Sequence, residues 1–247
     1  MDIREKVFSR IKRVWGRNLT IGTAWEHLYE FSQDIDIRTI MGAGFVVDYS
    51  SSSALDVAVT GTGARTIIGY GLDVNYKEVF EVVAMNGQTV VTGTQKFLRF
   101  FGMCIATHGS LNKNVGDIYA VKTGTGGTYT TGVPGTITSG LAKMLVAEGS
   151  AISGFYTVPA GKTLKLKRLS YGNYTQACQL GIFAQKNTGD DLSMGLEYIT
   201  GLGNQASGDI DLTSYGLSWP EKTDIFMRGK GAAASAATTA MMLLEEE

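Results

Sequence analysis

Cysteine, proline and histidine are scarce in this sequence, and each scarcity excludes a class of protein. Two cysteines, Cys104 and Cys178, stand far apart among 247 residues and lack the C-x-x-C spacing of a zinc or redox site, so we expect two buried thiols. Three prolines beside 32 glycines exclude collagen, which needs a strict glycine period and abundant proline. The two histidines, His27 and His108, lie in no H-E-x-x-H motif, so a zinc-protease template has no anchor.

Long apolar runs and excess charge are also missing. The sequence contains no run of about 18 apolar residues that could span a bilayer. Residues 1–6 are rich in charge and lead into no apolar segment of a secretory signal. A net charge of −1 and a pI of 6.2 lack the basic footprint of a nucleic-acid binder. We therefore expect no membrane partner and no direct nucleic-acid partner.

Nucleotide, hydrolase and calcium motifs do not occur either. The sequence has no G-x-S-x-G and no P-loop, and the relaxed dinucleotide pattern at residues 201–206 is followed by a turn rather than a helix. Aspartates occur in three pairs without calcium-loop spacing, namely Asp34 with Asp36, Asp190 with Asp191, and Asp209 with Asp211. We interpret each of these pairs as part of a solvent-exposed loop. The sequence thus predicts no catalytic residue, no cofactor and no metal site.

The first 17 residues carry apolar side chains at three- and four-residue spacing, which predicts an amphipathic helix with a strongly basic opposite face. Its apolar face is too large to leave in water. We therefore expect this helix to dock on another subunit or another partner surface, with its arginines against acidic side chains. The alternative is a helix that packs on its own domain. The partner-binding residues of this arm are Ile3, Val7, Phe8, Arg10, Ile11, Arg13, Val14, Trp15 and Arg17.

From Gly44 onward the sequence changes to short β-branched and aromatic stretches, separated by clusters of Gly, Asn, Asp, Ser and Thr. Residues 77–85 alternate like a pleated strand, and Asn86-Gly87 follows at once as a hairpin signal. Many short strands without long helices predict an all-β fold of antiparallel β-sandwich or jelly-roll units, behind a short N-terminal helical arm.

Glycine and threonine dominate residues 123–140, a composition typical of a mobile loop or connector. This stretch sets the expected domain boundaries. We expect the arm at residues 1–41, a first β-sandwich unit at 42–122, the connector at 123–140, and a second β-sandwich unit, or second half of one sandwich, at 141–247.

Several segments together carry a resemblance to a known family. They are Ser50-Ser51-Ser52-Ser53-Ala54-Leu55-Asp56, Gly61-Thr62-Gly63-Ala64-Arg65-Thr66, Gly71-Leu72-Asp73, Glu81, Asn86-Gly87, Phe97-Leu98-Arg99, Tyr156-Thr157-Val158-Pro159-Ala160-Gly161-Lys162-Thr163 and Pro220-Glu221-Lys222-Thr223-Asp224-Ile225. Over residues 45–247 this pattern resembles a widespread group of tailed-bacteriophage virion proteins of the cyanophage and marine phage type.

The resemblance implies a non-enzymatic virion structural protein, a capsid decoration (cement) protein that stabilises the phage head by binding the major capsid protein. It implies a homo-oligomer, expected as a trimer, whose partners are the major capsid protein or other virion subunits, located in the virion after assembly in the host cytoplasm. Near-zero net charge fits this role, because it limits self-repulsion when many copies crowd one shell. Two alternatives stay open: a tail or host-contacting protein whose loops bind surface glycan, and a depolymerase that uses one aspartate pair.

Overall fold

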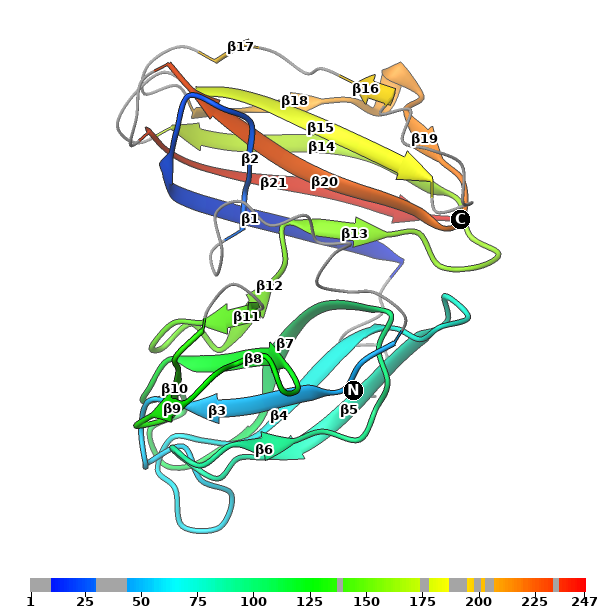
Figure 1. The fold of residues 1–247 in the computed structure, drawn as a ribbon. Helices are drawn as coiled ribbons and strands as arrows, with labels where there is room; N and C mark the ends of the chain where they lie inside the picture. The colour runs from blue at the N-terminus through cyan, green and yellow to red at the C-terminus, as the bar shows by residue number, and fades with distance from the viewer. Residues whose placement is uncertain are drawn as a thin grey trace. The chain divides into compact units, whose positions relative to one another are not determined.

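The computed structural model describes residues 10–29, 44–136, 140–173, 178–186, 195–197, 201–202, 207–232 and 236–247 (Figure 1). This part of the chain consists of β-strands and connecting loops, with one 3-10 turn, η1 (Thr213–Tyr215), as its only helical element. All strand pairs in it are antiparallel, so the predicted antiparallel all-β fold is confirmed. The described residues include no helix with the length and apolar character needed to cross a membrane.

The chain divides into two compact units. Residues 1–34 and 153–247 form the first, which we name the terminal unit because it combines both ends of the sequence. Residues 35–152 form the second, which we name the inserted unit because it lies between the two parts of the first in the sequence. Each unit has its own pair of sheets and its own apolar core.

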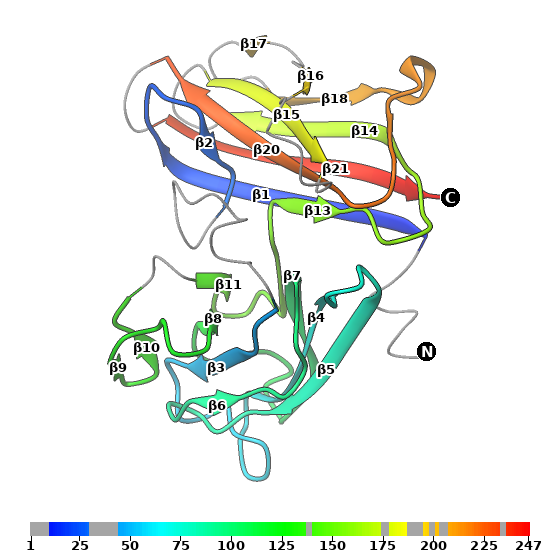
Figure 2. The same ribbon diagram turned by 45° about the vertical axis from the view of Figure 1, so that its right-hand side comes forward.

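The inserted unit is a sandwich of two four-stranded sheets (Figure 2). Its strands are β3 (Val47–Ser51), β4 (Ala64–Leu72), β5 (Glu78–Ala84), β6 (Val91–Thr92), β7 (Arg99–His108), β8 (Ile118–Lys122), β9 (Tyr129–Thr130), β10 (Val133–Pro134), β11 (Gly140–Met144) and β12 (Ser150–Ile152). The strand orders are β11-β8-β3-β6 and β12-β7-β4-β5, with β9 and β10 as a separate short hairpin. Tyr49 on β3 and Phe100 on β7 join the sheets through the core, with ring centroids 6.3 Å apart.

The terminal unit is a larger sandwich. Its strands are β1 (Ile11–Ile21), β2 (Glu26–His27), β13 (Phe155–Thr157), β14 (Leu164–Asn173), β15 (Cys178–Lys186), β16 (Gly195–Glu197), β17 (Gly201–Leu202), β18 (Ser207–Asp211), β19 (Ser218–Trp219), β20 (Thr223–Gly231) and β21 (Ala236–Glu246). One sheet has the order β1-β21-β14-β18, with β19 also on β14. The other has the order β13-β20-β15-β16, with β17 on β15 and β2 on β20. Alternate residues of each long strand, such as Val14, Met242 and Met227, are buried in the core.

The division of the chain differs from the expected boundaries in two places. Strands β11 and β12 pair with β8 and β7, so the chain returns to the inserted unit after its Gly/Thr-rich stretch instead of starting a new unit at residue 141. Strand β1 pairs with β21, so residues 11–21 are part of the terminal unit's own sheet instead of a separate arm. Both boundaries are set by pairing between strands that are distant in the sequence. Amino-acid composition does not indicate such pairing.

The helix expected over residues 1–17 is wrong for residues 11–17, which form strand β1. Its register joins Ile11 to Glu245 and continues without a break to Asn18 and Thr238. Side chains therefore alternate between the core and the outer face, and Val14 is buried inside its own unit. Of the expected arm residues, Ile3, Val7 and Phe8 lie outside the described residues.

Two inward-facing residues of β1 are not large apolar residues, so the sequence of this strand does not show the usual alternation of apolar and polar side chains. Lys12 is buried, and its Nζ lies 3.5 Å from Oε2 of the buried Glu246. The same Nζ lies 5.7 Å from the centre of the Tyr156 ring. Gly16 also faces inward, two inward positions after Lys12. A Cβ there would stand only 2.2 Å from the carbonyl oxygen of Leu28. A cation and a glycine thus occupy core positions that a period-two pattern expects to be apolar.

The Asn86-Gly87 turn is present, but it does not form the expected hairpin. Gly87 has φ +59°, as predicted, and Thr89 N donates to Asn86 O at 3.1 Å. The strand before the turn, β5, pairs with β4, whereas the strand after it, β6, pairs with β3 in the opposite sheet. The turn therefore carries the chain from one sheet of the sandwich to the other.

Candidate interaction surfaces

One carboxylate, that of Asp56, holds together the loops at one end of the inserted unit. Asp56 is fully buried between β3 and β4. Its Oδ1 accepts hydrogen bonds from Ala64 N at 2.7 Å and Val115 N at 3.0 Å. Its Oδ2 accepts from Ser51 Oγ at 2.6 Å and Gly116 N at 2.9 Å. Four donors saturate both oxygens, so this carboxylate serves as a structural anchor.

The main chain of Asp56 ties the Asn86-Gly87 turn to the same anchor. Gly87 N donates to Asp56 O at 2.8 Å, and Ser51 N donates to Gly87 O at 2.9 Å. Three of the segments that carry the phage resemblance, residues 50–56, 61–66 and 86–87, therefore meet at one point. They are determinants of the local fold, because each supplies a hydrogen bond to the frame around Asp56.

A second polar anchor, Asn114, fixes the two neighbouring loops. Its Nδ2 donates to Gly116 O at 2.8 Å and to Leu145 O at 2.7 Å, and its Oδ1 accepts from Gly149 N at 3.3 Å. Asn114 thereby joins the loop between β7 and β8 to the loop between β11 and β12. We name residues 52–63, 85–90, 109–117 and 145–149 the loop end of the inserted unit.

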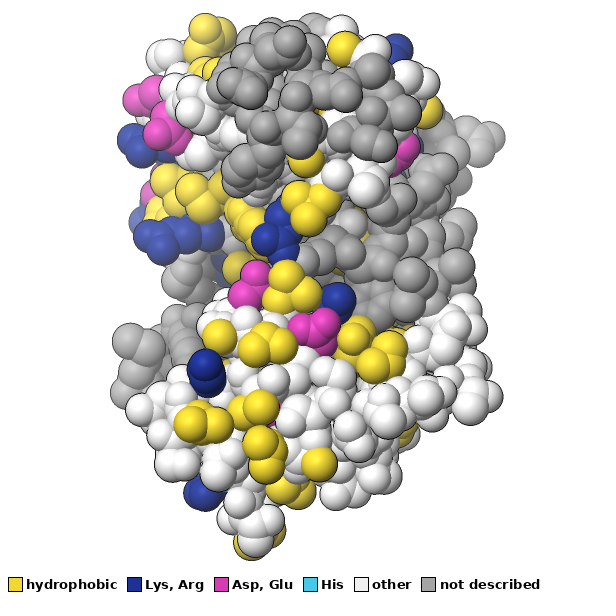
Figure 3. All heavy atoms as spheres, turned by 90° about the vertical axis from the view of Figure 1, so that its left-hand side faces the viewer, with side chains coloured by type: hydrophobic (Ala, Val, Ile, Leu, Met, Phe, Trp, Pro, Cys, Tyr) yellow, Lys and Arg dark blue, Asp and Glu magenta, His cyan; other side chains and the backbone are white. Residues whose placement is uncertain are grey.

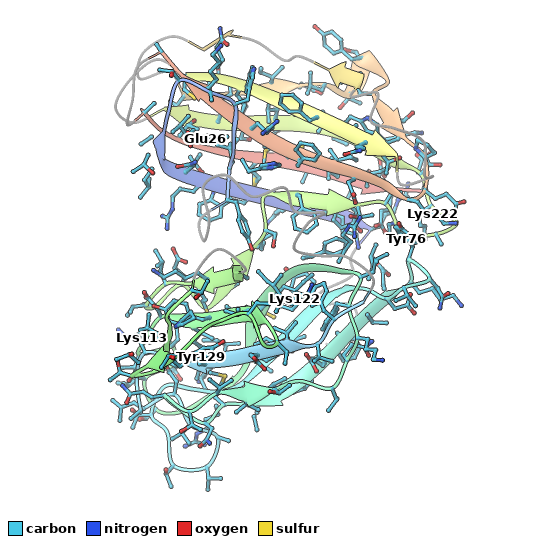
Figure 4. All side chains as sticks on the ribbon, in the orientation of Figure 1. Glu26, Tyr76, Lys113, Lys122, Tyr129 and Lys222 are labelled. Atoms are coloured by element: carbon cyan, nitrogen blue, oxygen red, sulfur yellow. The ribbon has the colours of Figure 1, made fainter. Side chains whose placement is uncertain are left out.

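The loop end presents apolar side chains to solvent from this rigid frame. Leu55 is 47% exposed, Val59 83%, Leu111 47% and Val146 51%, although each is a large hydrophobic residue. Figure 3 shows hydrophobic side chains in several groups on this side of the inserted unit, with a few charged side chains among them. Lys113, labelled in Figure 4, is one of the exposed charged residues of the loop end. Large apolar side chains exposed at one end of a unit favour an interaction site there.

A second candidate surface is the outer face of the five-stranded sheet in the terminal unit. The strand register places its outward residues in rows across the sheet. One row is Arg13, Leu243, Arg168 and Asp211, and the next is Trp15, Met241, Ser170 and Asp209. Cations and an aromatic ring thus lie on β1, partly exposed apolar residues on β21, Arg168 and Ser170 on β14, and carboxylates on β18.

Ion pairs occupy one end of this face. Glu245 on β21 accepts from Arg10 and Lys167, each at 2.8 Å, and Lys165 pairs with Glu247 at 2.6 Å. The hydrogen bond from Lys167 and the surrounding cations hold the pKa of Glu245 below its ordinary value. Hydrogen bonds from Thr213, with help from Arg168 and Lys167, likewise lower the pKa of Asp211. Both carboxylates therefore keep their charge to a lower pH than an ordinary carboxylate does.

The structure brings several predicted partner-binding residues to this face, although it replaces the helix with a strand. Ile11, Arg13, Trp15 and Arg17 all point outward on β1, and the Arg17 guanidinium lies 5.3 Å from the centre of a Trp15 ring system. Residues four apart share a face on a helix and also on a strand, because four is close to one helical turn and a multiple of two. Val14 points the other way, into the core.

The aspartate pair at residues 209 and 211 lies on a strand and not in the solvated loop that the sequence predicts. Both residues are exposed, outward positions of strand β18. Asp209 accepts a hydrogen bond from Ser170 Oγ on the adjacent strand. The pairs at residues 34 and 36 and at residues 190 and 191 lie outside the described residues. Within the described part, no three His, Cys, Asp or Glu side chains are grouped in a way that could hold a metal ion.

The two later segments of the phage resemblance also meet each other, in the terminal unit. Thr157 Oγ1 donates to Asp224 Oδ1, and Val158 N donates to Thr223 O at 2.9 Å. At the tip of the same connection, Gly161 N donates to the Glu221 carboxylate. These residues fasten β13 to the start of β20, so this second pair of segments is again a fold determinant.

Comparison with known proteins identifies no family for this chain. No family model matches the sequence, and no curated protein matches it. Among solved structures, that of infectious bursal disease virus Gx strain is 10% identical, with a TM-score of 0.21, and the match covers 96% of this chain and 75% of that one. The structure of the Gt strain is 12% identical, with a TM-score of 0.17, and the match covers 96% and 76%. TM-scores at this level establish neither a shared fold nor a shared function.

Proposed function

We propose that this chain is a non-enzymatic virion structural protein, and specifically a capsid decoration protein that binds the major capsid protein and stabilises a phage head. The resemblance of its sequence segments to tailed-bacteriophage virion proteins suggests the particle. The rigid, apolar loop end of the inserted unit suggests the mode of action, which is binding through shape and apolar contact.

The observation that carries this proposal is the contrast between anchored polar groups and exposed apolar tips. The side chains of Asp56 and Asn114 form hydrogen bonds within the loops that they connect. The side chains of Val59 and Leu111, in contrast, are exposed to solvent. A preformed frame lowers the entropy lost when a partner binds. Exposed apolar tips then supply the burial that stabilises a protein contact.

A binding role also agrees with how the buried carboxylates are used. Glu81, like Asp56, is occupied internally: it accepts from Tyr49 Oη at 2.9 Å and from Thr94 N at 2.8 Å. A carboxylate held by several donors is a poor general base, because its lone pairs are already engaged. We therefore propose no catalytic residue and no cofactor.

The proposed location is the virion, with assembly in the host cytoplasm and with further copies of the chain as partners. Both cysteines are free thiols, Cys178 being buried and Cys104 partly exposed. Burial raises the pKa of the Cys178 thiol, which keeps it protonated and unreactive. Free thiols are typical of proteins that fold in a reducing compartment.

Binding of loop-end variants to capsids tests the proposal. Val59→Asp and Leu111→Asp place a charge on the apolar tips and should abolish co-sedimentation with capsids that lack the protein. Val74→Asp is the matched control, because Val74 is an exposed valine of the same unit outside the loop end. Capsid binding that survives both loop-end substitutions would overturn the assigned surface.

Copy number per virion decides between the head and the tail alternative. A decoration protein covers the shell in hundreds of copies, whereas a tail or host-contacting protein that binds glycan is present in a handful. Quantitative mass spectrometry of purified virions makes this measurement. A low copy number together with glycan binding would replace the decoration role, and absence from the virion would overturn both.

A further inference from the structure

We propose that two copies of this chain form a two-fold dimer through the outer faces of their five-stranded sheets in the terminal unit. The proposed occupant of this face is thus a second copy of the same chain. The proposal does not depend on the virion role, since it rests on the register of β1, β21, β14 and β18 alone.

The distribution of charge across the face is what selects a second copy. The outward positions of β1 include Arg13 and Arg17 and no carboxylate. The outward positions of β18 are Ser207, Asp209 and Asp211, with no cation. One edge of the sheet is therefore basic and the opposite edge acidic, so that the face is complementary to itself.

The direction of the two-fold axis follows from this arrangement. An axis in the plane of the interface and parallel to the strands lays β1 of one copy over β18 of the other, whereas an axis across the strands would lay β1 over β1. Only the first relation pairs opposite charges. Aligned face-to-face packing of this kind is a common arrangement for β-sheets.

The rows of the sheet then give specific contacts. Arg13 shares a row with Asp211 of its own chain, so the two-fold rotation brings Arg13 opposite Asp211 of the partner subunit. Arg17 stands two rows further along, one row beyond Asp209 of the partner subunit. One row corresponds to about 6.8 Å along a strand, a distance that an arginine side chain can bridge.

Arg13 is available for such a contact. It is exposed, and within the described part of the chain it has no ion pair or hydrogen bond through its side chain. Asp209 and Asp211 are exposed as well; their nearest partners are Ser170, Thr213 and the neighbouring Arg168. The ion pairs around Glu245 are closed within one chain and border the face.

The face also carries partly exposed apolar side chains, those of Met241 and Leu243 on β21 between the two charged edges and that of Trp15 on β1 itself. The same rotation lays Leu243 over Arg168 of the partner subunit and Met241 over Ser170 of the partner subunit. The aliphatic part of an arginine side chain can pack on such apolar surface. Three strands of about nine residues and the five residues of β18, all about 4.8 Å apart, project roughly 500 Å² before side-chain relief is counted. This is about two thirds of the roughly 800 Å² per partner that a stable interface buries.

Charge reversal on each edge, measured with the full chain, tests the dimer. We expect the unmodified protein to sediment as a dimer whose affinity falls with rising salt, because part of the contact is ionic. The variants Arg13→Glu/Arg17→Glu and Asp209→Lys/Asp211→Lys each give the two edges of the face the same sign of charge, and each should weaken dimerisation by about a hundredfold or more. A one-to-one mixture of the two variants should form heterodimers.

A matched control and a second measurement complete the test. The variant Lys96→Glu/Lys113→Glu reverses two exposed charges in the inserted unit and should leave the dimer intact. In an Arg13→Lys variant, a zero-length carbodiimide cross-link should join residue 13 to Asp211 of the partner subunit, as shown by mass spectrometry of mixed isotope-labelled chains. A monomer, a trimer, or variants that dimerise as well as the unmodified chain would overturn the proposal.

Discussion

The carbonyl oxygen of Leu28 lies against the main chain of Gly16, so that a Cβ added at residue 16 would stand 2.2 Å from it. A Cβ at Gly154 would come within 2.0 Å of the same oxygen. Strand β1, the residue after β2 and the residue before β13 thus approach one another at a point where two glycines leave no side chain in the way. The close approach depends on glycine at both positions.

Gly16→Val should destabilise the protein by about 3 kcal/mol, because the new side chain overpacks this contact. Chemical denaturation followed by circular dichroism measures the change. Leu19→Ala, at an exposed position of the same strand, is the control and should change stability by no more than about 0.5 kcal/mol. Equal effects of the two substitutions would contradict the packing described for β1.

Asp56→Asn should cost about 3 kcal/mol, because the amide group places a donor against buried backbone donors that then lack an acceptor. Asp73→Asn is the matched control: Asp73 Oδ1 accepts from Asn75 N and Lys77 N in an exposed turn, and an asparagine retains that oxygen. Its cost should stay within about 0.5 kcal/mol. A small loss at residue 56 would show that the loops do not depend on the carboxylate.

Gly87→Ala and Gly149→Ala separate backbone strain from crowding. Both glycines have positive φ, +59° and +73°, so each substitution should cost about 1 kcal/mol in strain. A Cβ at residue 87 also meets Ala54 at 3.1 Å, whereas nothing lies within 4 Å of one at residue 149. Gly87→Ala should therefore be the more damaging change in thermal unfolding, and Gly87→Val more damaging still.

Tyr129→Phe should raise stability by up to about 1 kcal/mol, because the buried Tyr129 hydroxyl finds no hydrogen-bond partner among the described residues. Tyr49→Phe is the contrasting variant and should lower stability by about 1 to 2 kcal/mol, since Tyr49 donates to the buried Glu81. Equal effects of the two substitutions would contradict the hydrogen-bond assignments.

The same tyrosine makes a prediction for alkaline pH. Burial, with a contribution from Asp48, raises the pKa of Tyr129 to about 12. Folding therefore favours the neutral phenol, and its stabilising contribution is complete below the ordinary pKa of about 10 and is lost as the pH rises towards 12. Absorbance titration should show a phenol that ionises late, and Tyr129→Phe should make the loss of stability over this range shallower.

Deletion of residues 1–17 should unfold the terminal unit. The arm hypothesis expects this deletion to leave a folded β core that no longer assembles, but β1 pairs with β21 over residues 11–18 and buries Val14. Circular dichroism and limited proteolysis distinguish the two outcomes. A cooperatively folded terminal unit without β1 would favour the arm hypothesis.

The sequence predicts the strands well where their residues alternate and where turns are local. The expected strand at residues 77–85 is observed as Glu78–Ala84, and the positive φ of Gly87 is observed too. Strand β1 is missed because Lys12 and Gly16 occupy its core positions. Their compensating partners, Glu246 and Leu28, stand elsewhere in the chain.

The candidate surfaces are only partly predictable for a related reason. The sequence shows Asp56 among small residues, but its donors Val115 and Gly116 come from a loop some sixty residues away. Arg13 and Asp211 are likewise visible as charges, yet only the order β1-β21-β14-β18 places them at opposite edges of one face. Sheet order is set by long-range pairing, so local patterns do not contain it.

Strand β1 pairs with β21, which is more than 200 residues later in the sequence, so β1 has no partner strand until β21 has been synthesised. The inserted unit has its own two sheets and its own core, and it can fold on the ribosome while β1 is still unpaired. Until β21 emerges, β1 is an amphipathic strand without its partner, close to other nascent chains when many copies are made at once. Exchange of β1 between two chains would then produce an intertwined pair, so that the order of translation itself influences which assembly forms.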